Sequence, residues 1–231
     1  LTGGTGVDTF TVDLGTDVIT DLSATDVLKV SAGATANATV TAPWTADINT
    51  VNKGTANLTT SGSAVNLAAA DVFETLGYTV TNLGAGTTLT GSGGNDTLIA
   101  GNNGDTLIGG GGDDRLTGGT GVDRFIVDQG TDAITNLSGT DVLRVDVGAT
   151  ANATVTAPWT ADIYTINKGT ANLTTSGSAV NLAAADVSGT LGYTVTNLGA
   201  GTTLTGSGGN DTLIAGNSGD TLIGGGGDDR L

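Results

Sequence analysis

The chain has 231 residues, no Cys and no His, and a formal net charge of −16. The missing residue types exclude a disulfide framework, thiolate or imidazole metal sites and a His-dependent catalytic triad, and the excess of negative charge argues against nucleic-acid binding. Gly contributes 40 residues and Pro only 2, which excludes collagen, while 37% hydrophobic residues is too much for a disordered tail.

The sequence repeats itself after 115 residues. Leu1 corresponds to Leu116, Trp44 to Trp159, and Leu231 begins a third copy; 14 of the 115 positions differ between the two copies. A period of this kind indicates a repeat architecture. We interpret the chain as two units of a longer tandem array, and we find in it neither a targeting segment nor an apolar run long enough to span a membrane.

In chain order, the composition divides each copy into two kinds of segment. Residues 1–29, 73–144 and 188–231 are runs of nine-residue repeats, as in GGGGDDRLT (109–117) and GGTGVDRFI (118–126). Residues 30–72 and 145–187 are rich in Thr, Ala and Asn, with alternation such as Ala38-Thr39-Val40-Thr41. We call the latter the Thr/Asn segments and expect them to form wider β-coils without metal.

The eighth position of each nine-residue repeat is apolar. Between residues 80 and 143 it is Val80, Leu89, Leu98, Leu107, Leu116, Phe125, Ile134 and Leu143. Short strands separated by glycine turns allow this regular spacing, whereas a helix does not. Because strand side chains alternate between faces, the eighth position is expected to point inward and its Thr neighbours outward. Two repeats then form one coil of 18 residues, and successive coils stack about 4.8 Å apart.

The sixth position of the repeats is mostly Asp. Among the 23 acidic residues 22 are Asp, and the short carboxylates follow glycine-rich turns. Glycine allows positive φ and close approach of the backbone to an ion, and Ca²⁺ requires six to eight oxygen ligands. Two repeats, 73–81 and 82–90, carry Tyr78 and Thr87 instead, so we expect their coils to continue without metal. Asp113 and Asp228, at position five, are expected to face solvent.

The consecutive Gly-Gly-x-Gly-x-Asp units resemble the RTX, or haemolysin-type, calcium-binding repeats. The resemblance implies an all-β parallel β-roll with several Ca²⁺ ions per repeat, each held between turns two repeats apart, such as those of Asp96 and Asp114. The implied ligands are the sixth-position carboxylates and the oxygens of leading turn residues: Asp8, Asp17, Asp26, Asp96, Asp105, Asp114, Asp123, Asp132, Asp141, Asp211, Asp220, Asp229, Gly91, Gly93, Gly109, Gly111, Gly118 and Thr120. The Thr/Asn segments loosely resemble β-repeats found beside RTX units in large bacterial surface proteins.

These features predict a calcium-stabilised structural repeat of a secreted bacterial filament, surface layer or adhesin stalk, without enzymatic activity. Self-association end to end or laterally is expected, with a cell-surface polysaccharide as a further candidate partner. Two alternatives stay open: a module that binds carbohydrate or ice, and the export and folding module of a larger RTX enzyme. Trp44 and Trp159 bear on the first alternative, as either a surface for ligand stacking or, as we favour, buried space-fillers.

Overall fold

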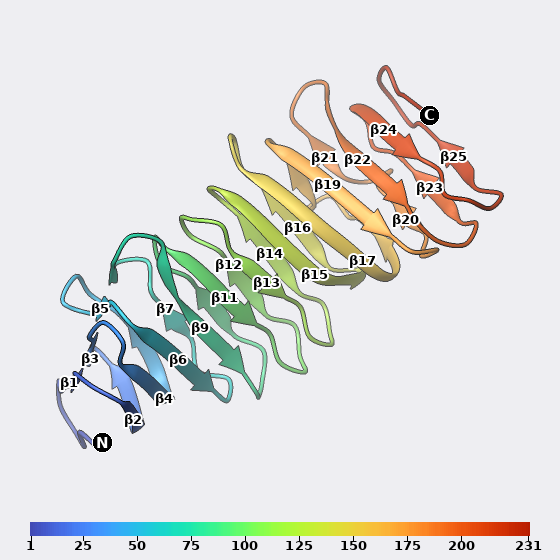
Figure 1. Ribbon diagram of the computed structural model, residues 1–231. Coiled ribbons are helices and arrows are strands. Elements are labelled where there is room, and N and C mark those ends of the chain that lie inside the picture. Colours follow the sequence, from blue (N-terminus) through green and yellow to red (C-terminus); the bar gives the residue numbers. More distant parts are fainter. The chain divides into compact units, whose positions relative to one another are not determined.

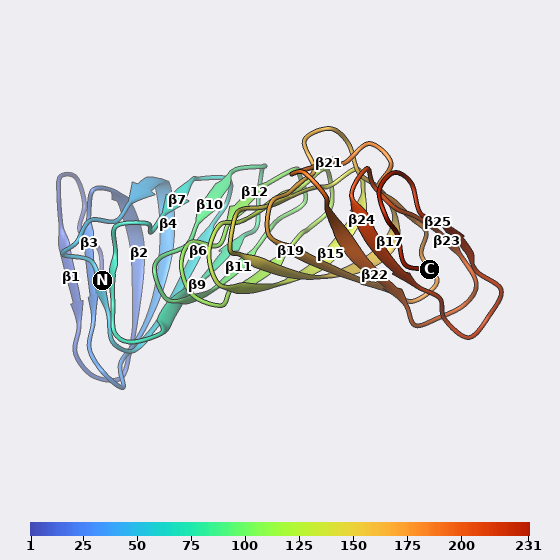
Figure 2. The same cartoon turned by 90° about the horizontal axis from the view of Figure 1, so that it is seen from above.

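The computed structural model describes residues 1–231 and contains strands but no helix, so no helical segment is available to cross a membrane. All strand pairs within its two compact units, residues 1–121 and 122–231, are parallel. The predicted all-β parallel solenoid is therefore confirmed. In each unit the strands lie one beside the next in the order of the coils (Figures 1 and 2).

The first unit holds thirteen strands, which are named here by their bounds. They are β1 (Thr9–Val12), β2 (Thr16–Ala24), β3 (Val27–Val30), β4 (Thr35–Thr45), β5 (Val51–Asn52), β6 (Thr55–Thr60), β7 (Val65–Asn66), β8 (Asp71–Val72), β9 (Leu76–Asn82), β10 (Thr88–Thr90), β11 (Asn95–Ile99), β12 (Thr106–Ile108) and β13 (Arg115–Thr117).

The second unit holds the corresponding strands of the second copy. They are β14 (Arg124–Val127), β15 (Thr131–Gly139), β16 (Val142–Val145), β17 (Thr150–Thr160), β18 (Ile166–Asn167), β19 (Thr170–Thr175), β20 (Val180–Asn181), β21 (Asp186–Val187), β22 (Leu191–Asn197), β23 (Thr203–Thr205), β24 (Asn210–Ile214) and β25 (Thr221–Ile223).

The strand registers give the length of each coil. In the nine-residue repeats, paired Cα atoms are 18 residues apart, as in Phe10↔Leu28 (β1 and β3) and Leu98↔Leu116 (β11 and β13). Across the Thr/Asn segment the step widens to 20 residues for Ala36↔Ala56, 22 for Leu58↔Val80 and 24 for Val65↔Leu89. The added residues lie in strands and turns of the same stack.

Strand β4 explains how a wider coil is built. Its first six residues pair with β6, while Trp44 and Thr45 near its end pair with Val65 and Asn66 of β7. One long strand therefore lies against two shorter ones of the next coil. The second unit repeats this arrangement, with Trp159 paired to Val180.

The core is the predicted ladder of eighth-position residues. Val80, Leu89, Leu98, Leu107 and Leu116 are all fully buried, whereas flanking threonines are only half-buried or exposed. Burial of one aliphatic side chain stabilises the folded state by about 1.5–3 kcal/mol. Because every coil buries its eighth-position residue, this energy determines which face of each strand points inward. The division into compact units falls between Gly121 and Val122, and the segment boundaries stay predictions.

Candidate calcium-binding turns

The sixth-position aspartates lie mostly inside the solenoid. Eight of the twelve are buried, and the other four are half-buried, namely Asp8, Asp17, Asp220 and Asp229. Asp113 and Asp228, at position five, are exposed as predicted. A buried carboxylate is costly unless hydrogen bonds or a cation compensate its charge, so the environment of each buried group is decisive.

Main-chain amides of two turns hold the carboxylate of Asp96. Oδ1 of Asp96 accepts the N–H of Tyr78, 18 residues earlier, at 2.6 Å, and Oδ2 accepts the N–H of Ser92, in its own turn, at 2.6 Å. The N–H of Asp96 in turn donates to Oδ1 of Asp114 at 2.8 Å. The carboxylate of Asp96 thus ties its own turn to the turn one coil before.

The same 18-residue contact recurs through both units. The donor and acceptor pairs are Asp8 and Asp26, Thr87 and Asp105, Asp123 and Asp141, Tyr193 and Asp211, Thr202 and Asp220, and Asp211 and Asp229, with N···Oδ1 distances of 2.6–2.9 Å. The expected neighbourhood of Asp96 with Asp114 is therefore present, and Asp123 lies beside Asp141 in the same way. No Lys or Arg donates to Asp96, Asp141 or Asp211 in these contacts.

Burial shifts the acidity of these groups. Desolvation raises the pKa of Asp96 and the pKa of Asp141 to about 6, and it raises the pKa of Asp211, although amide hydrogen bonds oppose the shift. At Asp220, which is more exposed, the N–H of Thr202 dominates and lowers the pKa. Burial is therefore the main cause of the raised pKa values, because it disfavours the charged form of a carboxylate.

Turn glycines are required by the neighbouring coil and by the backbone. A Cβ atom at Gly91 would lie 2.7 Å from Oδ2 of Asp96 and would also overlap the carbonyl oxygen of Gly109. Gly110 and Gly112 have φ of +96° and +100°, which L-residues with side chains rarely adopt. These positions alternate with Gly109 and Gly111, whose carbonyls are among the predicted ligands.

The other predicted oxygen donors occupy the same kind of turn. Gly93 is exposed and Gly118 is buried, and Thr120 donates its N–H to the carbonyl of Gly101 at 3.1 Å. Nowhere in the chain do three or more acidic side chains form a cluster. A cation between these turns would therefore take most of its oxygens from backbone carbonyls and only one or two from carboxylates, which suits a hard ion such as Ca²⁺.

Comparison with known families finds a match to these repeats. The family described as the RTX calcium-binding nonapeptide repeat (4 copies) matches residues 1–34, 84–116, 99–134, 108–143 and 199–231, which together make up more than half of the chain. The chain belongs to the RTX calcium-binding repeat family. No curated protein and no solved structure matches it. The RTX turns thus bind Ca²⁺ at several positions, while the ligand assignment of each individual residue stays a prediction.

Asp17 and Asp132 are followed by longer strands than the other RTX aspartates. Each is the second residue of a nine-residue strand, β2 or β15, just as Asp96 is the second residue of the five-residue strand β11. They pair with Ala36 and Ala151 of the next strand. A glycine with positive φ, Gly15 or Gly130, precedes each of them, and their ligand role stays a prediction.

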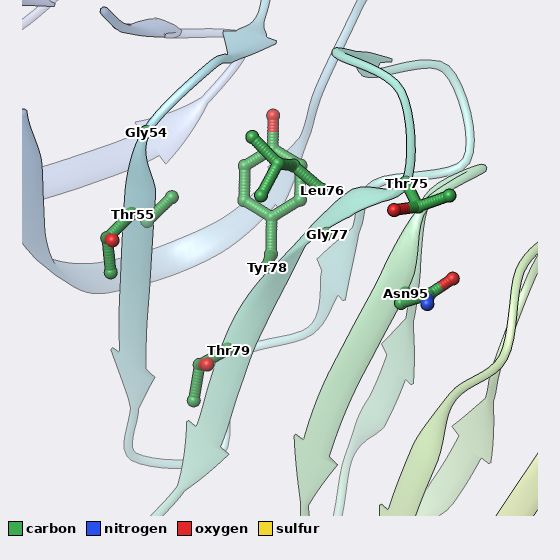
Figure 3. A pocket seen from close by; sticks show the side chains of 9 residues that line it. Gly54, Thr55, Thr75, Leu76, Gly77, Tyr78, Thr79 and Asn95 are labelled. Atoms are coloured by element: carbon green, nitrogen blue, oxygen red, sulfur yellow. The ribbon is translucent and has the colours of Figure 1, made fainter. Parts of the chain in front are cut away.

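The RTX repeats without a sixth-position Asp end the carboxylate ladder. Tyr78 and Thr87 supply main-chain N–H groups to Asp96 and Asp105 but no carboxylate of their own. Figure 3 shows Tyr78 on β9, between the strand of Thr55 and the strand of Asn95. Its side chain is buried, so these coils continue the core as predicted.

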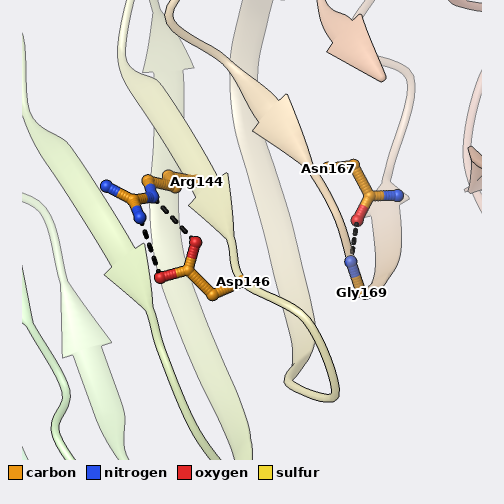
Figure 4. A network of polar contacts seen from close by, with 4 residues as sticks. All are labelled: Arg144, Asp146, Asn167 and Gly169. Atoms are coloured by element: carbon orange, nitrogen blue, oxygen red, sulfur yellow. Dashed lines mark hydrogen bonds and ion pairs between the residues drawn. The ribbon is translucent and has the colours of Figure 1, made fainter. Parts of the chain in front are cut away.

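Buried asparagines hold the turns of the Thr/Asn segments, a role that the sequence reasoning missed. Asn52 accepts the N–H of Gly54 at 3.1 Å and donates to the carbonyl of Gly77 at 2.6 Å. Figure 4 shows the equivalent bond from Gly169 to Asn167 in the second copy. The spacing Asn-x-Gly, which occurs again at Asn82, was the available signal, because Asn side chains bond the backbone two residues on.

The two tryptophans are space-fillers in the wide coils. Trp44 and Trp159 are each 1% exposed, and their indole N–H groups donate to the carbonyls of Asp26 and Asp141 at 2.8 Å. The favoured interpretation is confirmed, and the alternative of a tryptophan surface for ligand stacking is wrong. The indole instead joins each Thr/Asn segment to the last aspartate turn before it.

Proposed function

We propose that this RTX chain is a calcium-stabilised structural repeat of a secreted bacterial filament, surface layer or adhesin stalk. The observation that carries the proposal is the equality of the stacking interfaces. The β4–β6 register Thr35↔Thr55 recurs as Thr150↔Thr170 in β17–β19, and the β6–β9 register Leu58↔Val80 recurs as Leu173↔Val195. A scaffold made by stacking requires such repeated interfaces.

Calcium would make the stacking of the coils depend on the calcium concentration outside the cell. Carboxylates one coil apart repel one another by about 1 kcal/mol per pair even in bulk water, and a cation between the turns removes that cost. Extracellular calcium modules bind with dissociation constants of roughly 10⁻⁴–10⁻³ M, and binding energy of this kind becomes folding energy. The chain would therefore fold after export, in keeping with RTX repeats being typical of secreted bacterial proteins.

Self-association belongs to the same proposal. Successive coils pair in parallel through the same 18-residue register, as in Leu98↔Leu116 and Leu204↔Leu222. A coil of another copy could continue such a ladder, because an unpaired parallel strand presents free N–H and C=O groups. A structural role needs no catalytic group, and we propose none. A cell-surface polysaccharide stays a predicted partner, but the buried tryptophans do not form its binding surface.

Electron microscopy and sedimentation of the 231-residue chain test this proposal. We expect elongated particles or end-to-end filaments in millimolar Ca²⁺ and their loss in EGTA, with Mg²⁺ at the same concentration as the control for ionic strength. Filaments that persist unchanged in EGTA would contradict the calcium-dependent assembly. Well-folded monomers at all protein concentrations in Ca²⁺ would contradict the self-association.

A further inference from the structure

The junction between the first Thr/Asn segment and the following RTX turns contains an unusual donor. Oδ1 of Asp105 accepts the N–H of Thr87 at 2.7 Å, as expected for the 18-residue contact, and also accepts Nδ2 of Asn82 at 2.9 Å. Oδ2 accepts the N–H of Gly101 at 2.9 Å. Asp96, Asp141 and Asp211 receive bonds from main-chain amides or from serine hydroxyls in the same positions, and none of these bonds comes from a side-chain amide.

Asn82 places its NH₂ group between oxygens of two successive turns. Nδ2 donates to the carbonyl of Ala85, in the turn of residues 82–90, at 2.8 Å, and to the carboxylate of Asp105, in the turn of residues 100–108, at 2.9 Å. A side-chain amide carries two N–H donors, one for each oxygen. A carbonyl of one turn and a carboxylate one coil later are also the kinds of oxygen that a calcium ion between RTX turns would bind.

The amide oxygen completes the link toward the preceding coil. Oδ1 of Asn82 accepts the N–H of Gly62 at 2.9 Å and the N–H of Gly84 at 3.0 Å. The side chain is 1% exposed, so water does not compete for these bonds. One neutral side chain therefore joins the turns of three successive coils, and all of its hydrogen-bonding groups are satisfied.

We propose that the Asn82 amide takes the place of a calcium ion at the junction between the turns of residues 82–90 and 100–108, so that this junction closes without metal. The inference rests on calcium binding by the other RTX turns. The second copy repeats the arrangement: Asn197 donates to Ala200 at 2.8 Å and to Asp220 at 2.9 Å, and accepts from Gly177 at 2.9 Å and Gly199 at 3.0 Å.

The position of Asn82 within its repeat supports this assignment. It occupies position one, where the calcium-type repeats 91–99, 109–117 and 118–126 have glycine. At Gly91 a Cβ atom would overlap the carbonyl oxygen of Gly109, so that turn admits no side chain, whereas the turn of Asn82 accommodates an amide with its donors. The coil that follows the Thr/Asn segment would then offer a metal-independent contact on which the first calcium turns stack in their correct register.

Amide hydrogen exchange of the full chain, resolved by residue with NMR, tests the inference in Ca²⁺ and in EGTA. The N–H groups of Thr87 and Thr202 report the two asparagine junctions, and those of Asp96 and Asp123 report calcium-type turns. We expect EGTA to change the exchange of Thr87 and Thr202 by less than about twofold, and to accelerate exchange at Asp96 and Asp123 by about tenfold or more. Equal acceleration at all four would overturn the inference but leave the calcium role intact, whereas no acceleration anywhere would overturn the calcium role itself.

The variant Asn82→Asp sharpens the test, with Asn197 as an internal control in the same molecule. A carboxylate at residue 82 would face that of Asp105, so the exchange of Thr87 should accelerate by about tenfold on addition of EGTA and recover in Ca²⁺, while Thr202 should not change. Thr87 protection in EGTA equal to that of the unmodified chain would overturn the inference. Asn82→Gly, which restores the glycine of a calcium-type turn, should show the same gain of calcium sensitivity and serves if Asn82→Asp does not fold.

Discussion

The RTX turns and the Thr/Asn segments solve one packing problem with different buried polar groups. Both stack parallel strands over an aliphatic core, but the former bury aspartates such as Asp96 and Asp141, and the latter bury Asn52, Thr60 and Asn167. An amide satisfies itself with donors and acceptors of the backbone, whereas a carboxylate retains a charge that requires a cation. The comparison teaches that calcium dependence comes from the turn residues and not from the solenoid fold.

Among the predicted effects, removal of calcium should cause the largest difference in stability between the RTX turns and the Thr/Asn segments. With a dissociation constant of about 1 mM, saturation at about 10 mM Ca²⁺ stabilises the folded chain by about 1.4 kcal/mol per site, so several sites together contribute several kcal/mol. We expect a lower unfolding temperature in EGTA by circular dichroism, while the buried Trp44 and Trp159 retain blue-shifted fluorescence longest. Identical melting curves in Ca²⁺, Mg²⁺ and EGTA would contradict this difference between the regions.

Replacing one buried aspartate by asparagine should lower the stability of the chain in Ca²⁺ and raise it in EGTA. Asp114 is 1% exposed and its neighbour Asp113 is exposed, which provides a matched pair of substitutions. In Ca²⁺, Asp114→Asn should destabilise the chain by about 1–3 kcal/mol through loss of a charged ligand, and in EGTA it should stabilise the chain by relief of repulsion. Asp113→Asn should change little in either buffer, and calorimetric melting would report an equal effect of the two variants if the contrast were wrong.

Acidification should stabilise the calcium-free chain. Burial raises the pKa of Asp96 and of Asp141 from 3.8 to about 6 in the folded state, so protonation favours folding, and this contribution is complete below pH 4 and lost as the pH rises through 6. Between pH 7 and pH 5 each group should add about 1 kcal/mol in EGTA. In Ca²⁺ the same acidification removes ligands and should lower stability. Urea unfolding at the two pH values, with and without Ca²⁺, measures both signs.

The smallest effect should come from the ion pair that distinguishes the two copies. Arg144 donates to Asp146 at 2.8 and 3.0 Å (Figure 4). The first copy has Lys29 and Ser31 at the equivalent positions. Partly exposed pairs contribute about 0–1 kcal/mol. We expect Arg144→Lys with Asp146→Ser to shift the urea midpoint of the chain only marginally. A loss as large as that caused by Asp114→Asn would show that copy-specific surface contacts, and not the turns, dominate stability.

The nine-residue period allowed much of the fold to be predicted. An apolar residue at every eighth position determines which face of each strand is buried, and Leu89, Leu98 and Leu107 are buried as expected. The repeat position also predicted that Asp113, at position five, is exposed, and it distinguished this residue from Asp114, which lies at position six and is buried. Both predictions depend only on the local alternation of strand side chains.

Other features depend on which residues meet between coils, and the sequence alone does not supply that register. The bond from Asn52 to Gly77 spans 25 residues, and the bonds of Asn82 reach Gly62 and Asp105 in different coils. The amide contacts of Asp96 were missed for the same reason, since the aspartate was interpreted only as a cation ligand. The length of β2, which runs from Thr16 to Ala24 through the start of the next repeat, was not predicted either.

The parallel pairing of successive coils has a mechanical consequence. Each coil bonds only to the coils on either side of it, so a pulling force applied to the two ends of the polypeptide passes through the coil-to-coil ladders in series. The weakest ladder would open first, and release of one 18-residue coil would lengthen the chain by about 60 Å. Under tension in low calcium, the chain would yield in discrete steps at the aspartate turns and act as an extensible tether.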